Sequence, residues 1–130
     1  MSKTVLTVED QPDIRRLIRM TLEFKGYQVV EAGSGTEGLE AARRHRPDLI
    51  LLDKMMPGMD GLTVSRTLAA DPTLASIPRV MLSALGMAED RKTGLEAGVV
   101  AYLVKPFSPM ELLNLVDRLT AAPATPASVA

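Results

Sequence analysis

The chain has 130 residues, which fits one domain large enough to bury a core without cross-links. Its 15 Lys and Arg residues nearly balance its 16 Asp and Glu residues, so it lacks the basic excess of a typical nucleic-acid-binding domain. Because it contains no cysteine, disulfides, thiolate metal sites and cysteine nucleophiles are excluded.

The two ends of the sequence carry no targeting or membrane signal. No apolar run follows a basic leader at the start, and apolar stretches such as residues 49–52 are far too short to span a bilayer. We therefore expect a cytoplasmic protein that contacts neither membrane nor nucleic acid directly. We expect residues 1–120 to form one domain, and residues 121–130, rich in Ala, Pro, Thr and Ser, to be a disordered tail.

In chain order, short β-rich runs alternate with helical patterns. The predicted strands are Thr4–Val8, Tyr27–Glu31, Asp48–Leu52, Arg79–Leu82 and Ala101–Val104. The continuously apolar run of the third is typical of a strand that is covered on both faces.

Five helices are predicted between and after these strands. The first has apolar residues at helical spacing from Ile14 to Leu22, with Pro12 in its first turn and Gly26 beyond its end. Ser34 and Glu37 form a predicted capping box for the second, which continues to about Arg44.

The later helices are less uniform. The third follows Gly61, and the fourth, from about Ala88 to Ala97, is weak because Gly94 lies inside it. The fifth begins with Ser108, Pro109 and Glu111, a second capping box. The strand–helix alternation predicts an α/β fold, a doubly wound five-stranded parallel sheet with five helices on both faces.

Polar side chains stand at the carboxyl ends of the predicted strands, where such sheets bind ligands. They are Glu9 and Asp10 after the first strand, Asp53 after the third, Ser83 after the fourth and Lys105 after the fifth. Three neighbouring carboxylates need a cation, and oxygen ligands suit Mg²⁺. An Asp side chain can serve as a nucleophile, and phosphoryl transfer depends mainly on positioning and charge neutralisation. The pattern therefore indicates a phosphoryl-accepting carboxylate.

The same residues lie in segments that resemble bacterial response-regulator receiver domains, over roughly Lys3 to Leu119. The segments are Val8-Glu9-Asp10, Leu51–Gly61 (with Asp53-Lys54-Met55-Met56-Pro57-Gly58), Ser83-Ala84 and Tyr102-Leu103-Val104-Lys105-Pro106-Phe107. The resemblance implies the strand order 2-1-3-4-5 of the flavodoxin-like fold. It also implies two-component signal transduction, in which Asp53 accepts its group from a sensor histidine kinase or a phosphotransfer protein.

Further roles follow from the resemblance alone. Asp10 would bind Mg²⁺ directly, Glu9 would bind it largely through water, and the backbone carbonyl of Met55 would join Asp53 as a ligand. Lys105 would pair with the phosphoryl oxygens. The chain would be no enzyme in the ordinary sense, since it would catalyse only its own phosphorylation and dephosphorylation.

The resemblance also implies a switch. Ser83 would bond the phosphoryl group, Tyr102 would change its exposure in concert, and the Lys105–Pro106 peptide bond would be cis. The fourth helix, fifth strand and fifth helix would form the face for a downstream effector or for a dimer. Where many family members have acidic residues just before the aromatic residue, this chain has Val100 and Ala101, which indicates a more apolar face. No DNA-binding segment follows the fifth helix, so we expect output through a partner protein, unless the chain is one piece of a longer one.

Two features near the acceptor bear on the lifetime of the phosphorylated form. Met55 and Leu85 flank the place where hydrolytic water would enter, and neither can orient water. We therefore expect slow self-dephosphorylation.

Three other interpretations remain open. A flavin-binding module would share the sheet, although its phosphate loop would meet the acidic residues 9–13. A turnover phosphatase with an Asp nucleophile often has a second acid two residues on, where this chain has Met55. The third is a scaffold whose site is no longer phosphorylated.

Overall fold

A central parallel sheet organises the part of the chain that the computed structural model describes, residues 2–84 and 97–121. Its strands are β1 (Thr4–Val8), β2 (Gln28–Ala32), β3 (Leu49–Asp53), β4 (Arg79–Ala84) and β5 (Val99–Lys105). They pair in the order β2-β1-β3-β4-β5, with every neighbouring pair parallel. The predicted topology is confirmed, and the predicted strand bounds were wrong by one or two residues in four of the five.

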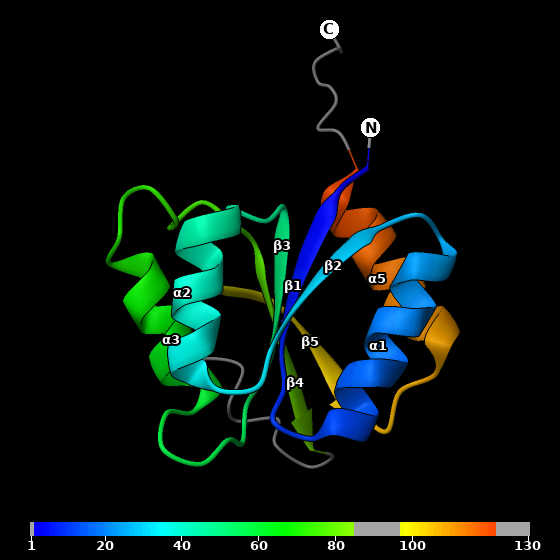
Figure 1. Ribbon diagram of the computed structural model, residues 1–130, viewed down its shortest axis with the longest axis horizontal. Coiled ribbons are helices and arrows are strands. Elements are labelled where there is room, and N and C mark those ends of the chain that lie inside the picture. The colour runs from blue at the N-terminus through cyan, green and yellow to red at the C-terminus, as the bar shows by residue number, and fades with distance from the viewer. Residues whose placement is uncertain (1, 85–96, 122–130) are drawn as a thin grey trace, which may run out of the picture.

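The described helices are α1 (Pro12–Phe24), α2 (Gly35–His45), α3 (Gly61–Ala69) and α5 (Pro109–Thr120). Helices α1 and α5 cover one face of the sheet and α2 and α3 the other (Figure 1). The predicted fourth helix falls outside the described residues except for Ala97, which lies in a turn. None of the described helices is both long and apolar enough to cross a membrane.

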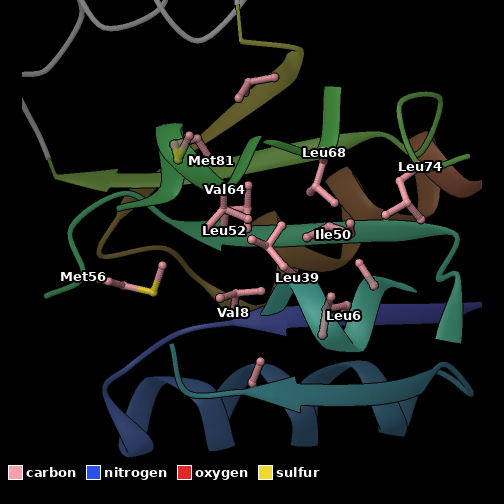
Figure 2. Packing of buried hydrophobic residues seen from close by; sticks show 13 residues of the cluster. Leu6, Val8, Leu39, Ile50, Leu52, Met56, Val64, Leu68, Leu74 and Met81 are labelled. Carbon is pink, nitrogen blue, oxygen red and sulfur yellow. The ribbon is translucent and has the colours of Figure 1, made fainter. Parts of the chain in front are cut away.

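Each face of the sheet has its own apolar core. On the α2/α3 face, Leu39 of α2 and Val64 and Leu68 of α3 pack onto Ile50 and Leu52 of β3 (Figure 2). The other core joins α1 and α5 to the opposite face of the same strands. Strand β3 is buried throughout, as its apolar run predicts, so the residue at its end is held by a rigid, fully covered element.

Helix caps follow the sequence signals with one correction. Ser108 and Glu111 form the predicted capping box at α5. Ser34 accepts from the Glu37 N–H as predicted, but the Glu37 carboxylate accepts from the Gly33 N–H at 2.7 Å and not from Ser34. The second half of that box was therefore wrong, because the preceding residue offers the carboxylate a closer donor.

Candidate phosphoryl-acceptor site

The predicted site residues converge at the carboxyl edge of the sheet. Glu9 and Asp10 directly follow β1, Asp53 is the last residue of β3, and Lys105 is the last residue of β5. Carboxylate oxygens of Glu9, Asp10 and Asp53 all lie within 4.8 Å of one another. Lys105 Nζ lies 3.1 Å from Asp53 Oδ1 and 3.2 Å from Glu9 Oε1. Lys105 thus contacts two of the three clustered acids.

Burial makes this charge imbalance significant. Glu9 is fully buried, and Asp53 is only 4% exposed. The pKa of Glu9 is raised to about 7, first by burial and then by the hydrogen bond and charge of Asp53, while Lys105 and the Gln11 N–H lower it. The site therefore favours a bound proton or cation beside Asp53.

Asp10 and Asp53 line a small cavity of about 190 Å³. Its walls include Asp10, Asp53, Met55, Ser83 and Lys105. The Met55 N–H donates to Asp53 Oδ1 at 3.3 Å, and the Met55 side chain is 65% exposed. Glu9, Asp10 and Asp53 offer carboxylate oxygens, the ligands that Mg²⁺ prefers, so the residues present fit this ion.

The turn after β3 depends on Gly61, which the sequence marks as the start of a helix. A Cβ on Gly61 would lie 2.5 Å from the Asp53 carbonyl oxygen and 2.8 Å from Met81 Sδ. Asp60 caps α3 by accepting from the Thr63 N–H at 2.9 Å. The first turn of α3 can therefore press against the strand end that carries Asp53 only because residue 61 has no side chain.

The two predicted switch residues lie in different surroundings. Ser83 is 4% exposed and lines the acidic cavity. Tyr102 is half-buried and packs against the core on the α2/α3 face, to which Met81, opposite it on β4, also belongs. The Lys105–Pro106 bond is cis, as predicted.

One neighbour of the acids was missed. Arg15, on α1, donates from Nη1 to the backbone carbonyl of Glu9 at 2.8 Å. Nothing in the spacing of α1 distinguishes Arg15 from Arg16 as the residue that turns inward, because the contact depends on how the helix is rotated against β1.

A five-stranded sheet in this order, with an acidic cluster and a lysine at its carboxyl edge, defines a class of phosphoryl-accepting signalling domain. The family model of the response regulator receiver domain matches residues 5–117. The chain belongs to this family and is a receiver domain of two-component signal transduction.

Individual relatives agree with this assignment. The chain is 41% identical over 113 residues to the phosphate regulon transcriptional regulatory protein PhoB of Pseudomonas aeruginosa, covering 87% of this chain and 49% of that protein. It spans about half the length of the curated relatives that it matches.

Solved structures show the same fold. The chemotaxis protein CheY4 of Vibrio cholerae has a TM-score of 0.88 at 33% identity, covering 92% of this chain and 99% of that one. The receiver domain of the sensor histidine kinase PA1611 of Pseudomonas aeruginosa has a TM-score of 0.85 at 32% identity, covering 94% of this chain and 100% of that one. The latter structure has a magnesium ion coordinated in its active-site cleft.

Proposed function

We propose that Asp53 is the phosphoacceptor of this receiver domain and takes its group from a sensor histidine kinase or a phosphotransfer protein. One observation carries the proposal: the Asp53 carboxylate is buried, contacts Lys105 at 3.1 Å and shares a cluster with Glu9 and Asp10. An oxygen of Asp53 attacks the phosphorus of the donor, and the bond from phosphorus to the donor atom breaks with its electron pair leaving on the donor. Lys105 neutralises charge on the phosphoryl oxygens.

Mg²⁺ is the proposed cofactor. Asp10, Asp53 and the Met55 carbonyl would hold it directly, and Glu9 largely through water. When bound, the ion supplies positive charge that offsets the three acids and the incoming phosphoryl group. The proposal draws support from the oxygen-rich donor set and from the magnesium ion in the related PA1611 domain.

The chain acts as a switch and not as a turnover enzyme, because the group it receives stays on its own side chain until it is hydrolysed. In the phosphorylated form Ser83 bonds the phosphoryl group and Tyr102 moves with it. The output face is that of the fourth predicted helix, β5 and the fifth helix, for a downstream effector or a dimer. Val100 is 51% exposed on β5, which supports an apolar partner surface.

The remaining parts of the proposal concern the extent of the domain. Residues 1–120 form the receiver domain with five helices, and residues 121–130 are a tail. We place the protein in the cytoplasm, because the kinase that would donate the phosphoryl group acts there.

Intact mass after incubation with acetyl phosphate and Mg²⁺ tests the acceptor. We expect one phosphoryl group on the wild type, none on Asp53→Ala, and none on the wild type after Mg²⁺ is removed. Glu40→Ala is the control, since Glu40 is an exposed acid on α2. An Asp53→Ala protein that still gains the group would refute the assignment, and a folded wild type that never gains it would favour the scaffold interpretation.

A further inference from the structure

The backbone on both sides of Glu9 is held by hydrogen bonds. The Glu9 N–H donates to the Ala32 carbonyl at the end of β2, at 3.0 Å. The Glu9 carbonyl accepts from Arg15 Nη1 at 2.8 Å. Because this carbonyl belongs to the Glu9–Asp10 peptide, Arg15 limits the rotation that would swing both carboxylates.

Arg15 is itself held in place. Its Nε donates to Glu31 Oε1 at 3.1 Å, and the other oxygen of Glu31 accepts from Arg19 Nη1 at 2.6 Å. The Arg15 and Glu31 side chains are only 24% and 26% exposed, so water screens their pairing less than it screens a surface ion pair. A guanidinium group can bond a carbonyl and a carboxylate at once because its donors form a rigid fork.

The surroundings leave Arg15 little room to move. A Cβ on Gly33 would lie 3.4 Å from Arg15 Nη1 and 3.3 Å from Glu37 Oε1, so the backbone after β2 packs closely against the guanidinium group. The hydrogen bonds to Glu9 and Glu31, together with this close packing, hold the Arg15 side chain in one rotamer.

We propose that Arg15, oriented by Glu31, is a positioning residue for the Mg²⁺ site and holds the Glu9–Asp10 peptide so that both carboxylates face Asp53. The inference rests on the proposed function of that site. Residues that orient metal ligands typically change metal affinity 10- to 100-fold when removed, which sets the scale of the effect.

The direction of the change in Mg²⁺ affinity distinguishes a positioning role of Arg15 from a purely electrostatic one. Removing a positive side chain beside a cation site should, by electrostatics alone, tighten Mg²⁺ binding. Loss of ligand positioning should weaken it. A weaker Mg²⁺ affinity in Arg15→Ala therefore has no explanation in the loss of charge.

The primary measurement is the Mg²⁺ dissociation constant, from amide chemical shifts in an NMR titration of the unphosphorylated protein. We expect about tenfold weaker binding for Arg15→Ala and weaker binding for Glu31→Ala, which leaves Arg15 present but unheld. Arg16→Ala, an exposed arginine on the same helix, is the control for charge and should not weaken binding. Arg15→Lys should recover part of the affinity, because an ammonium group can reach one of the two acceptors.

The rate of phosphorylation by acetyl phosphate gives a second readout. The deficit of Arg15→Ala should be large at low Mg²⁺ and vanish at saturating Mg²⁺. Unchanged or tighter Mg²⁺ binding in a folded Arg15→Ala protein would overturn the inference; if that variant does not fold, the same result in Glu31→Ala would overturn it. A wild type that does not bind Mg²⁺ would instead refute the proposed function, and the inference with it.

Discussion

Two buried charged clusters lie at opposite ends of the sheet and are built in opposite ways. The acidic site, formed by Glu9, Asp10, Asp53 and Lys105, lies at the carboxyl edge. The arginine cluster lies at the amino end of β4, where Arg79 is 1% exposed. Among the described residues, no carboxylate pairs with Arg79.

The arginine cluster is satisfied by neutral oxygens. Arg79 donates to Ser65 Oγ at 2.9 Å and to the carbonyls of Ala75, Ile77 and Ala97 at 3.0, 2.9 and 3.4 Å. A Cβ on Gly98, whose φ is +93°, would lie 1.9 Å from Arg79 Nη2, so only glycine fits there. Burial alone lowers the pKa of Arg79, and the guanidinium group stays charged because each of its three nitrogens has an acceptor.

The acidic site is less well compensated, since the ion pairs seen there in the described part of the chain join Lys105 to two of three clustered acids. A buried charge whose hydrogen bonds are satisfied joins elements of the fold, as Arg79 joins α3, β4 and the turn before β5. A buried charge left under-compensated raises the energy of the fold and is ready to bind a cation or a reactant. The comparison teaches that burial alone does not separate a structural charge from a functional one, and that the balance of partners does.

The largest expected effect is on the chemistry of the acidic site. Lys105→Ala should lower the rate of phosphorylation by acetyl phosphate roughly 100-fold, because it removes the ammonium group that lies 3.1 Å from Asp53 Oδ1. The rate of mass gain at saturating Mg²⁺ measures this. Lys3→Ala, an exposed lysine ahead of β1, should react like the wild type. A Lys105→Ala rate close to that of the wild type would remove Lys105 from the mechanism.

The matching change in the arginine cluster should affect stability and not chemistry. Arg79→Met would leave the carbonyls of Ala75 and Ile77 without their side-chain donor and Ser65 Oγ without the N–H that it accepts, and we expect it to lower the free energy of unfolding by about 3 kcal/mol. Urea unfolding measures the loss, with exposed Arg66→Met as the control. The folded fraction should still accept a phosphoryl group at the wild-type rate. A small loss of stability would mean that this cluster, too, is poorly matched.

The acidic site should also make stability depend on pH, with a defined sign. The folded pKa of Glu9 is about 7, against 4.5 for a free carboxyl, so the folded state holds a proton that the unfolded state releases. The contribution of Glu9 to the free energy of unfolding is therefore fully present below about pH 4.5. It is lost as pH rises through 7, and the loss is at most about 3 kcal/mol.

Urea unfolding between pH 4.5 and 8 without metal tests this dependence. Glu9→Gln should flatten it, and so should Mg²⁺, which favours the ionised carboxylate. A metal-free protein that grows more stable over this range would contradict the assignment of an uncompensated Glu9.

The fold was predictable because its signals are local and agree with one another. The apolar run of β3 predicts a doubly covered strand, and Ser108 with Glu111 predicts the start of α5. The strand ends were less predictable: Asp53 proves to be the last residue of β3, because the ladder to β4 continues through the pair Asp53–Leu82. Pairing with a neighbour extends a strand beyond its apolar run.

The acidic site was predictable to the extent that parallel strands bring their carboxyl ends together. Asp53, Glu9 and Lys105 therefore met as expected. The burial of Arg79 and the inward turn of Arg15 were not predictable, since both depend on tertiary contacts with backbone carbonyls. Every residue has a backbone carbonyl, so a sequence does not mark which carbonyls accept from an arginine. A pair of opposite charges, in contrast, can be proposed from the residue types.

The smallest expected effect concerns water at the mouth of the acidic cavity. Met55 lines this cavity and is largely exposed, and a thioether is too weak an acceptor to orient an attacking water molecule. Met55→Asn supplies an amide at the same place, and we expect it to speed loss of the phosphoryl group roughly fivefold, which corresponds to about 1 kcal/mol of barrier. Met55→Leu, with similar size and no polar group, is the control.

The decay of the phosphorylated protein, followed by intact mass after removal of acetyl phosphate, measures the difference between Asn and Leu at position 55. Faster decay in Met55→Asn alone would mean that the wild type is slow because its cavity mouth cannot hold a water molecule in line with phosphorus. Equal decay in both variants would mean that residues deeper in the cavity, such as Ser83 or Lys105, set the lifetime of the phosphorylated form. The apolar side chain of Met55 would then serve to contact a partner protein.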